Sequence, residues 1–296
     1  MSFSHTPVML KETIELLNLR HGDAVIDGTV GLGGHAKIIL AKISPDGRLL
    51  AIDRDPRQIV LAQKNLVDFG DRVVFANDSY LNLNKLAYDQ GFVPAAAVLL
   101  DLGFSSVHVA DSTRGFSFQT EGPLDMRYDP NGELTATEII NHWSEIELAR
   151  IFLVYGEEKN AKKLARAIGQ ARHQKEFSTT TELSELIETV TPRRGKTHPA
   201  TKVFQALRIT VNNELEELEK ALPEIIKILK PGGRLAVITF HSLEDGLVKK
   251  VFKKFNQKEI KIINKHVIVP TEEEVKSNPR SRSAKLRVVE KILMPN

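Results

Sequence analysis

Cysteine is absent from the 296-residue chain. Its absence excludes disulfide bonds, metal sites with cysteine ligands and every mechanism that needs a thiol nucleophile. Long hydrophobic runs are absent too, because the longest uniform one, Ala95–Leu100, is far shorter than the roughly 18 residues needed to cross a bilayer. The N-terminus also lacks the basic start and apolar block of a signal peptide. A soluble cytoplasmic protein without a membrane partner is expected.

Positive charge exceeds negative charge only slightly, with a net charge of +3, but the charged residues are unevenly distributed along the chain. Segment 246–296 holds 13 lysine and arginine residues against 5 aspartate and glutamate residues. Such a region is typical of a surface that binds a polyanion by releasing counterions from phosphates. The alternative interpretation is a lysine-rich helix exposed to solvent.

Short apolar runs alternate with stretches of helical length at both ends of the chain. This alternation predicts an α/β fold in which helices cover both faces of a parallel sheet. A helix carrying Leu10, Ile14 and Leu17 is expected before the first strand, and Thr271–Ser283 is expected to be a disorder-prone linker. The predicted strands are Ala24–Ile26, Leu49–Ile52, Val73–Phe75, Ala95–Leu100, Arg234–Phe240, Ile260–Val269 and Leu286–Leu293.

Between the two sets of strands, the strand pattern is missing for about 130 residues after Leu102. Helical patterns fill this segment: a capping box at Ser144 and Glu147 opens one helix, and further helices are expected over 157–171 and 182–190. The sequence therefore predicts a discontinuous domain, residues 1–105 and 212–296, interrupted by a mainly α-helical subdomain over 106–211.

A glycine-rich loop follows the first predicted strand and opens a helix. The pattern Gly31-x-Gly33-x-x-Ala36 satisfies a dinucleotide-binding fingerprint, and Asp53, which closes the second strand, is placed to accept hydrogen bonds from a ribose. The loop therefore predicts a cofactor that contains a nucleoside. A tight strand-to-helix turn that needs glycine for structural reasons is the alternative.

Asp27, at the start of this loop, helps to choose the cofactor. A carboxylate there would repel a pyrophosphate but attract the ammonium group of a sulfonium amino acid, which favours S-adenosylmethionine. Asp27 could instead cap the loop through backbone N–H groups. A nicotinamide-dependent oxidoreductase remains the second enzyme hypothesis.

Asp101 follows the fourth strand, at the sheet edge where ligand crevices form. A carboxylate there could accept a hydrogen bond from an amine while the amine attacks a methyl group. Methylation of a pyrimidine ring carbon ordinarily needs a thiolate, so the missing cysteine leaves transfer to nitrogen or oxygen. Capping of a helix or loop is the alternative role of Asp101.

Cations and aromatic residues in the insert predict contacts to RNA. Arg114, Phe116 and Phe118 suit the stacking of an unpaired base beside its phosphate, although the two phenylalanines could belong to a core. Further basic residues are candidates for phosphate contacts. A solvated loop is the alternative for those that precede position 200, and some of Arg280, Arg282, Lys285 and Arg287 could instead pair with buried carboxylates. These candidates are Arg193, Arg194, Lys196, His198, Arg280 and Arg282.

Segment 241–245 contains histidine, serine and aspartate, but neighbouring positions do not form a catalytic triad. Ser242 is expected to cap the following helix, with Asp245 completing the pattern. No histidine pair has metal-ligand spacing with a third ligand, so no catalytic metal is predicted.

Nine sequence blocks, in order, resemble the bacterial ribosomal RNA small subunit methyltransferase H family, and together they cover nearly the whole chain. The last block is far more specific than any glycine loop. The blocks are His5–Met9, Asp27–His35, Asp101–Ser106, Arg114–Phe118, Gly122–Arg127, Thr197–Thr201, Phe204–Arg208, Phe240–Asp245 and Asn278–Arg287.

The resemblance implies an S-adenosylmethionine-dependent enzyme that methylates N4 of a cytidine in the decoding centre of 16S rRNA. It also implies a Rossmann-like catalytic domain interrupted by a helical substrate-recognition domain. A non-enzymatic RNA-binding assembly factor is a third hypothesis. The sequence decides neither between naked rRNA and an assembled small subunit as substrate, nor between a monomer and a homodimer.

The resemblance carries over a set of cofactor contacts, of which Tyr80 and His108 depart from the phenylalanine and glutamine usual in the family. The implied contacts are Gly33, Gly34, His35, Asp53, Tyr80, Asp101 and His108.

Overall fold

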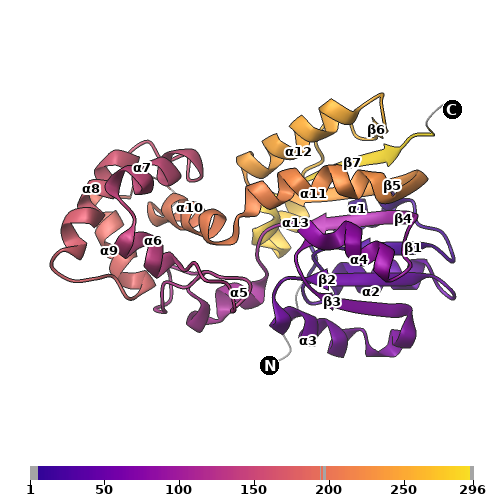
Figure 1. Ribbon diagram of the computed structural model, residues 1–296, viewed down its shortest axis with the longest axis horizontal. Coiled ribbons are helices and arrows are strands. Elements are labelled where there is room, and N and C mark those ends of the chain that lie inside the picture. The colour runs from indigo at the N-terminus through magenta and orange to yellow at the C-terminus, as the bar shows by residue number, and fades with distance from the viewer. Residues whose placement is uncertain (1–5, 194, 196–197, 294–296) are drawn as a thin grey trace. The chain divides into compact units, whose positions relative to one another are not determined.

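The computed structural model describes residues 6–193, 195 and 198–293. The chain forms two compact units, one made of Met1–Gly103 and Leu215–Asn296 and the other of Phe104–Glu214 (Figure 1). In the described part of the chain, no helix has both the length and the apolar character that a membrane span requires.

The discontinuous unit is built on a seven-stranded sheet of order β3-β2-β1-β4-β5-β7-β6. The first five strands run parallel, whereas β7 is antiparallel to both of its neighbours, so the sheet is mixed rather than wholly parallel. The strands are β1 (Ala24–Asp27), β2 (Arg48–Asp53), β3 (Val73–Asn77), β4 (Ala95–Asp101), β5 (Leu229–Thr239), β6 (Ile260–Ile262) and β7 (Lys285–Lys291).

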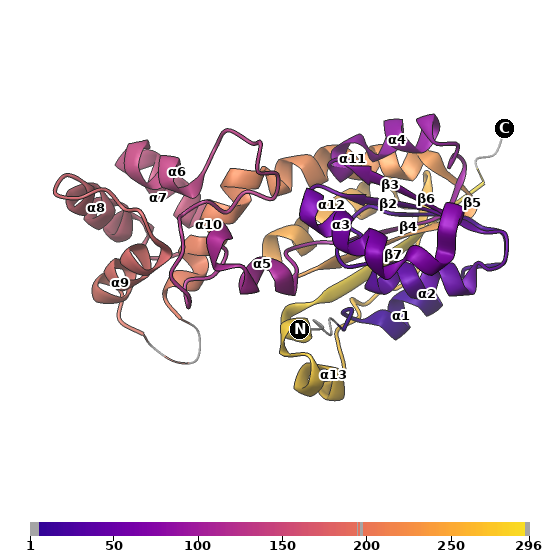
Figure 2. The same ribbon diagram turned by 90° about the horizontal axis from the view of Figure 1, so that it is seen from below.

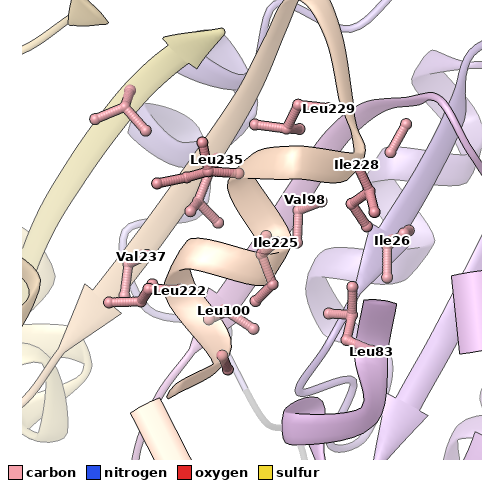
Figure 3. Packing of buried hydrophobic residues seen from close by; sticks show 14 of the residues in the cluster. Ile26, Leu83, Val98, Leu100, Leu222, Ile225, Ile228, Leu229, Leu235 and Val237 are labelled. Carbon is pink, nitrogen blue, oxygen red and sulfur yellow. The ribbon is translucent and has the colours of Figure 1, made fainter. Parts of the chain in front are cut away.

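Helices cover both faces of this sheet, which explains why the central strands are continuous apolar runs. One face packs against α4 (Leu83–Asp89), α11 (Glu214–Ile228) and α12 (Ser242–Phe255), and the cluster between them contains Val98 and Leu100 of β4 (Figure 3). The opposite face lies against α1 (Leu10–Leu17), α2 (Gly34–Lys42) and α3 (Pro56–Asn65) (Figure 2). Ala97 and Leu99 of β4 belong to the cluster on this side. Burial of both faces fixes the strand register, because a shift by one residue would exchange the two clusters.

The inserted unit is mainly helical, and most of its helices share one hydrophobic core that includes Ile139, Phe152, Leu164, Ile187 and Leu207. The capping box predicted at Ser144 and Glu147 is present, with Ser144 Oγ accepting the Glu147 N–H and the Glu147 carboxylate accepting the Ser144 N–H. The helices are α5 (Ser106–Ala110), α6 (Ala136–His142), α7 (Glu145–Val154), α8 (Ala161–Arg172), α9 (Thr180–Val190) and α10 (Ala200–Asn212).

The predicted strand Ile260–Val269 is too long, because β6 ends at Ile262. The side chain of Asn264 then takes the place of regular strand pairing: its amide donates to the Leu286 carbonyl and its oxygen accepts the Val288 N–H. Pairing resumes only at a single bridge between Ile268 and Leu286.

The prediction of a linker over Thr271–Ser283 is wrong. The segment forms α13 (Glu272–Ser277) and a 3₁₀ helix, Pro279–Ser283. Thr271 caps α13 by accepting the Glu274 N–H, and the Glu274 carboxylate accepts the Met9 N–H. These contacts, one of them to the other end of the chain, order a segment whose composition is polar.

The helix predicted over 157–171 begins only at Ala161. Glu157 has a left-handed backbone with φ of 50°, and the Glu158 carboxylate accepts the Asn160 N–H, so a turn precedes the helix.

Candidate active site

The loop between β1 and α2 is shaped by glycines at its closest contacts. Gly33, with φ of 83°, is the N-cap of α2, a conformation that favours glycine. A Cβ on Gly34 would lie 2.4 Å from Pro7 Cγ, so a larger residue would collide there. A Cβ on Gly28 would come within 2.6 Å of Leu100 Cδ2, which fixes the start of the loop against β4.

Asp53, at the end of β2, ties this loop to the neighbouring strand. Its Oδ2 accepts the Gly31 N–H at 2.9 Å, and its Oδ1 accepts the Asp55 N–H at 2.9 Å. Asp53 therefore holds the backbone of the loop at the place where the sequence predicted a ribose acceptor.

Asp27 is buried at the end of β1, with 1% of its surface exposed. Burial raises its pKa to about 7, with a further rise from the charge of Asp53 and an opposing contribution from its hydrogen bond to the Thr29 N–H. The loop-capping bond that the sequence left open is thus present. Because the pKa lies near neutrality, a cation bound nearby would favour the ionised form of Asp27.

Asp101 ends β4 beside the same loop, and its backbone N–H donates to Thr29 Oγ1 at 2.6 Å. Burial raises the pKa of its carboxyl group well above the usual range, and the nearby Asp27 and Glu244 raise it further. Its Oδ1 is a buried atom without a hydrogen-bond partner among the described residues. A buried polar atom in this condition marks a position where a ligand could supply the partner.

His35, in the first turn of α2, is 6% exposed. Its Nε2 lies 3.0 Å from the Val8 carbonyl oxygen, and its Nδ1 lies 3.6 Å from Asp101 Oδ2. Because a carbonyl oxygen can only accept, Nε2 is the nitrogen that carries hydrogen. The ring therefore presents Nδ1 to the carboxyl group of Asp101.

The sheet brings most of the predicted cofactor residues together in one unit, at the carboxyl ends of β1, β2 and β4. Tyr80 also approaches the loop, because its Cβ lies 3.5 Å from the Cβ position of Gly28. The residues assembled in this way are Asp27, Gly31, Gly33, Gly34, His35, Asp53, Tyr80 and Asp101.

His108 belongs to the inserted unit, where it lies in α5. Its Nδ1 accepts the Ser105 N–H at 3.0 Å, which completes a capping box at the start of this helix. The imidazole also packs against Phe116 and Tyr128, with ring centroids 5.0 and 5.3 Å away. The described contacts of His108 therefore lie within its own unit.

The inserted unit contains an aromatic cluster that sequence reasoning identified only in part. Phe104 is 40% exposed, stacks on Phe116 with centroids 6.1 Å apart, and has the guanidinium of Arg208 4.8 Å from its ring. Arg208 is held by a bidentate ion pair with Glu214, at 2.8 and 2.9 Å. Phe104 and Arg208 both lay within sequence blocks already singled out, but their contact, like the packing of Tyr128 on Phe116, is not revealed by sequence spacing.

Arg114 is buried in the inserted unit, and this placement contradicts the expectation that it holds an RNA phosphate. Its Nη2 donates to the backbone carbonyls of Arg127 and Tyr128 at 2.6 and 3.0 Å. The side chain is only 6% exposed, so its guanidinium orders the surrounding loop.

The two phenylalanines near Arg114 occupy different environments. Phe116 is 8% exposed and belongs to the core of the unit, as the alternative interpretation expected. Phe118 is half-buried and stacks on the His198 ring at 4.7 Å, while it meets Phe204 edge to face. His198 also accepts the Ala200 N–H at the start of α10.

The basic loop before α10 is described only in part, because Arg194 and Lys196 lie outside the described residues. Arg193 is exposed, and its Nε donates to the Gly195 carbonyl at 3.3 Å. A cavity of about 350 Å³ adjoins this loop, and Lys163, His198 and Lys202 are among its lining residues.

The basic residues near the C-terminus divide into two groups. Lys285 and Arg287 pair with Asp245, with Arg287 Nε 2.7 Å from Oδ1 and Lys285 Nζ 3.2 Å from Oδ2. Arg280 and Arg282 are exposed on the 3₁₀ helix Pro279–Ser283. The expected alternative of pairing to a carboxylate therefore applies to the first group.

The prediction that Ser242 caps α12 is wrong, because His241 occupies the N-cap position. His241 Nδ1 accepts the Glu244 N–H, and the Glu244 carboxylate accepts the N–H groups of Phe240 and His241. Asp245 instead holds the cations of β7.

The chain is similar to known proteins over nearly its whole length. The MraW methylase family matches residues 2–292. The chain is 48% identical over 293 residues to a ribosomal RNA small subunit methyltransferase H from Elusimicrobium minutum, covering 98% of this chain and 99% of that protein. It is 49% identical over 288 residues to the protein of the same name from Dictyoglomus thermophilum, covering 97% and 96%.

The similarity in structure is weaker. The crystal structure of a candidate rRNA methylase from Clostridium thermocellum superposes with a TM-score of 0.50 at 16% identity, covering 97% of this chain and 98% of that one. At this identity the likeness concerns the fold alone.

Proposed function

Because the chain belongs to the MraW methylase family and matches the ribosomal RNA small subunit methyltransferases H over nearly its full length, we propose that it shares their reaction. The enzyme transfers a methyl group from S-adenosylmethionine to the exocyclic N4 amine of a cytidine in the decoding centre of 16S rRNA. The observation that carries this proposal is Asp101, whose largely buried carboxyl group ends β4 beside the glycine loop.

The residues around the loop fit S-adenosylmethionine. Asp27 and Asp53 place two carboxyl groups at the carboxyl edge of the sheet, which suits an ammonium and a ribose better than a pyrophosphate. Oδ1 of Asp101, which has no hydrogen-bond partner in the described part of the chain, adds a polar atom that a ligand can satisfy. The residues that would hold the cofactor are Asp27, Gly31, Gly33, Gly34, His35, Asp53, Tyr80 and Asp101.

When bound, S-adenosylmethionine supplies an electrophilic methyl group on a sulfonium. An exocyclic amine can attack this group directly once it is aligned, so orientation supplies much of the rate enhancement. A carboxyl oxygen of Asp101 that accepts a hydrogen bond from the amine localises the nitrogen lone pair for this attack. The chain lacks cysteine, which disfavours the thiolate-dependent methylation of a pyrimidine carbon.

The helical unit, Phe104–Glu214, is assigned to substrate recognition, and the remainder of the chain to catalysis. Arg193, His198, Arg280 and Arg282, together with Arg194 and Lys196, are assigned to RNA phosphates, and Phe118 to a base. The target base would leave its stack so that its amine edge reaches Asp101.

The substrate is assigned as 16S rRNA within the small ribosomal subunit, and the reaction to the cytoplasm. The names of the relatives support the first assignment. The sequence leaves open whether the protein is a monomer or a homodimer. Sedimentation equilibrium of the purified protein distinguishes the two.

The test is incubation of the protein with methyl-labelled S-adenosylmethionine and small subunits lacking the modification, in parallel with naked 16S rRNA. Mass spectrometry of the digested nucleosides then identifies the product. N4-methylcytidine from a single site supports the proposal, with the particle a better substrate than naked RNA. Label in C5-methylcytidine, or no label under conditions where the cofactor binds, would contradict it.

A further inference from the structure

Asp101 and His35 form a pair whose geometry extends the reaction beyond the methyl-transfer step. Asp101 presents one oxygen, Oδ2, to His35 Nδ1 at 3.6 Å, while its other oxygen, Oδ1, is buried without a partner among the described residues. His35 in turn is oriented by the Val8 carbonyl at 3.0 Å. A row of polar groups in this order is what a proton would need to leave the reacting amine.

We propose that His35 is the terminal proton acceptor of the reaction and receives, through the carboxyl group of Asp101, the proton that the target amine loses. The inference rests on the proposed function, because it needs an amine as the methyl acceptor. In this role His35 accepts a proton. A residue that only contacts the cofactor would not need to do so.

The tautomer of His35 supports this assignment. The Val8 carbonyl oxygen can only accept, so it selects the form with hydrogen on Nε2. In the neutral ring, Nδ1 then carries a lone pair that faces Asp101. In other proteins too, a hydrogen bond from one imidazole nitrogen to a backbone carbonyl sets the tautomer, which leaves the other nitrogen able to accept a proton or bind a partner.

The protonation state of Asp101 fits the same arrangement. Burial raises the pKa of its carboxyl group, and Asp27 on β1 and Glu244 on α12 add to the rise. A protonated Asp101 can place its hydrogen on Oδ2, toward His35, and leave Oδ1 as the acceptor for the amine. The 3.6 Å separation exceeds a hydrogen bond, but such contacts commonly shorten when substrate binds.

The step balances in atoms and charge. The N4–CH₃ bond forms as the C–S bond breaks, with its electron pair going to sulfur, so the positive charge moves from sulfur to nitrogen. N4 then loses a proton to Asp101 Oδ1 while the Oδ2 proton passes to His35 Nδ1. Asp101 is neutral before and after, and the positive charge ends on the imidazolium of His35.

This inference predicts that the rate of transfer falls on acidification, since a protonated His35 cannot accept a second proton. Three other titratable groups lie around Asp101 and His35, namely Asp27, Glu244 and His241, which contacts Glu244 at 3.1 Å. Asp27, with a pKa of about 7, titrates near neutrality, and its effect on the rate must be distinguished from that of His35 experimentally.

The test compares His35→Gln with the wild type, with Asp27→Asn and with His142→Gln. The amide of glutamine can still donate to the Val8 carbonyl but provides no titrating nitrogen toward Asp101. His142 is an exposed histidine of the inserted unit, 53% exposed, and serves as the matched control. Single-turnover rates on small subunits are measured from pH 5.5 to 9, at cofactor concentrations that saturate each variant.

The expected result is a loss of about 100-fold in the His35→Gln rate at pH 7.5, typical of removing a general base. Its acid limb should be lost, while Asp27→Asn and His142→Gln keep theirs. A His35→Gln rate within threefold of the wild type at saturating cofactor would overturn the inference. An acid limb that persists in His35→Gln but vanishes in Asp27→Asn would also overturn it.

A measurement on the wild-type protein covers the case in which His35→Gln does not fold. Two-dimensional ¹⁵N NMR of histidine-labelled protein reports which ring nitrogen carries hydrogen, and His35→Asn assigns the signal. The Nε2–H form above the acid limb supports the inference, and the Nδ1–H form contradicts it.

The outcomes also separate this inference from the proposed function. If the wild type makes no N4-methylcytidine, both fail. If the wild type makes it and His35→Gln makes it equally fast, only the role of His35 fails.

Discussion

The carboxylate of Asp53, the last residue of β2, accepts the backbone N–H of Gly31 in the loop after β1 at 2.9 Å. The same carboxylate accepts the Asp55 N–H, so one side chain orders the ends of β1 and β2 together. The shape of the candidate cofactor site therefore depends partly on the hydrogen bonds that Asp53 accepts from the loops after β1 and β2.

Replacing Asp53 with alanine should lower stability, because two backbone N–H groups lose their acceptor. We expect a decrease of about 1–3 kcal/mol in the free energy of unfolding, together with weaker binding of S-adenosylhomocysteine. Urea denaturation and calorimetric titration measure the two effects. Asp46→Ala, which removes an exposed carboxylate from the turn before β2, is the control; equal effects of the two variants would contradict this role of Asp53.

Asp27 should make the stability of the protein depend on pH. Its pKa is about 7 in the folded state against 3.8 for the unperturbed group, so between these values the folded state binds a proton that the unfolded state lacks. The free energy of unfolding therefore falls as pH rises through this window and levels off above about pH 7.

The variant Asp27→Asn removes this titration and keeps an oxygen that can accept the Thr29 N–H. Its stability relative to the wild type should increase by about 3 kcal/mol between pH 5 and pH 8, since two pKa units correspond to that free energy. Urea titrations at both pH values test the difference. A difference that is the same at both pH values would show that Asp27 is not titrating.

Arg114 should behave as a structural residue. Substitution by lysine keeps the charge but loses the paired donation to the carbonyls of Arg127 and Tyr128, so we expect a loss of about 1–3 kcal/mol in stability. Thermal unfolding of Arg114→Lys measures it. An unchanged melting temperature together with weaker RNA binding would restore the phosphate-binding role.

Arg280 and Arg282 should behave in the opposite way, because both are exposed. The double alanine variant should keep its melting temperature but bind small subunits more weakly. A plot of log affinity against log salt concentration should have a shallower slope, by about 1 for each phosphate that the variant no longer neutralises. Lys11 and Lys42, exposed on α1 and α2, provide a double variant of equal charge change. The same weakening in that control would indicate a nonspecific effect of net charge.

Much of the fold follows from the sequence because a buried parallel strand leaves a clear pattern. β4 is apolar along most of its length, since its two faces lie under different helices, and Asp101 interrupts that pattern at its end. The carboxyl ends of parallel strands share one edge of the sheet, which is why the sequence alone is enough to group Asp27, Asp53 and Asp101.

Other features depend on contacts between distant parts of the chain and could not be predicted. α13 is a short polar segment whose position is fixed by the bond from Met9 to Glu274, 265 residues apart in sequence. Arg114 was expected to bind phosphate because it lies beside two phenylalanines in the sequence. Its actual partners are backbone carbonyls, which leave no sequence pattern. The approach of His35 to Asp101 likewise requires the fold, because the two residues lie on different elements.

The most direct test of the account is the rate at which Asp101→Asn forms N4-methylcytidine in small subunits, measured in a single turnover at saturating S-adenosylmethionine. Asparagine nearly preserves the shape of the side chain but cannot relay a proton between its two terminal atoms. We expect a fall of about 100-fold or more in this rate when the cofactor is saturating. A rate close to that of the wild type would contradict it, because the carboxyl group would then be unnecessary for transfer to the amine.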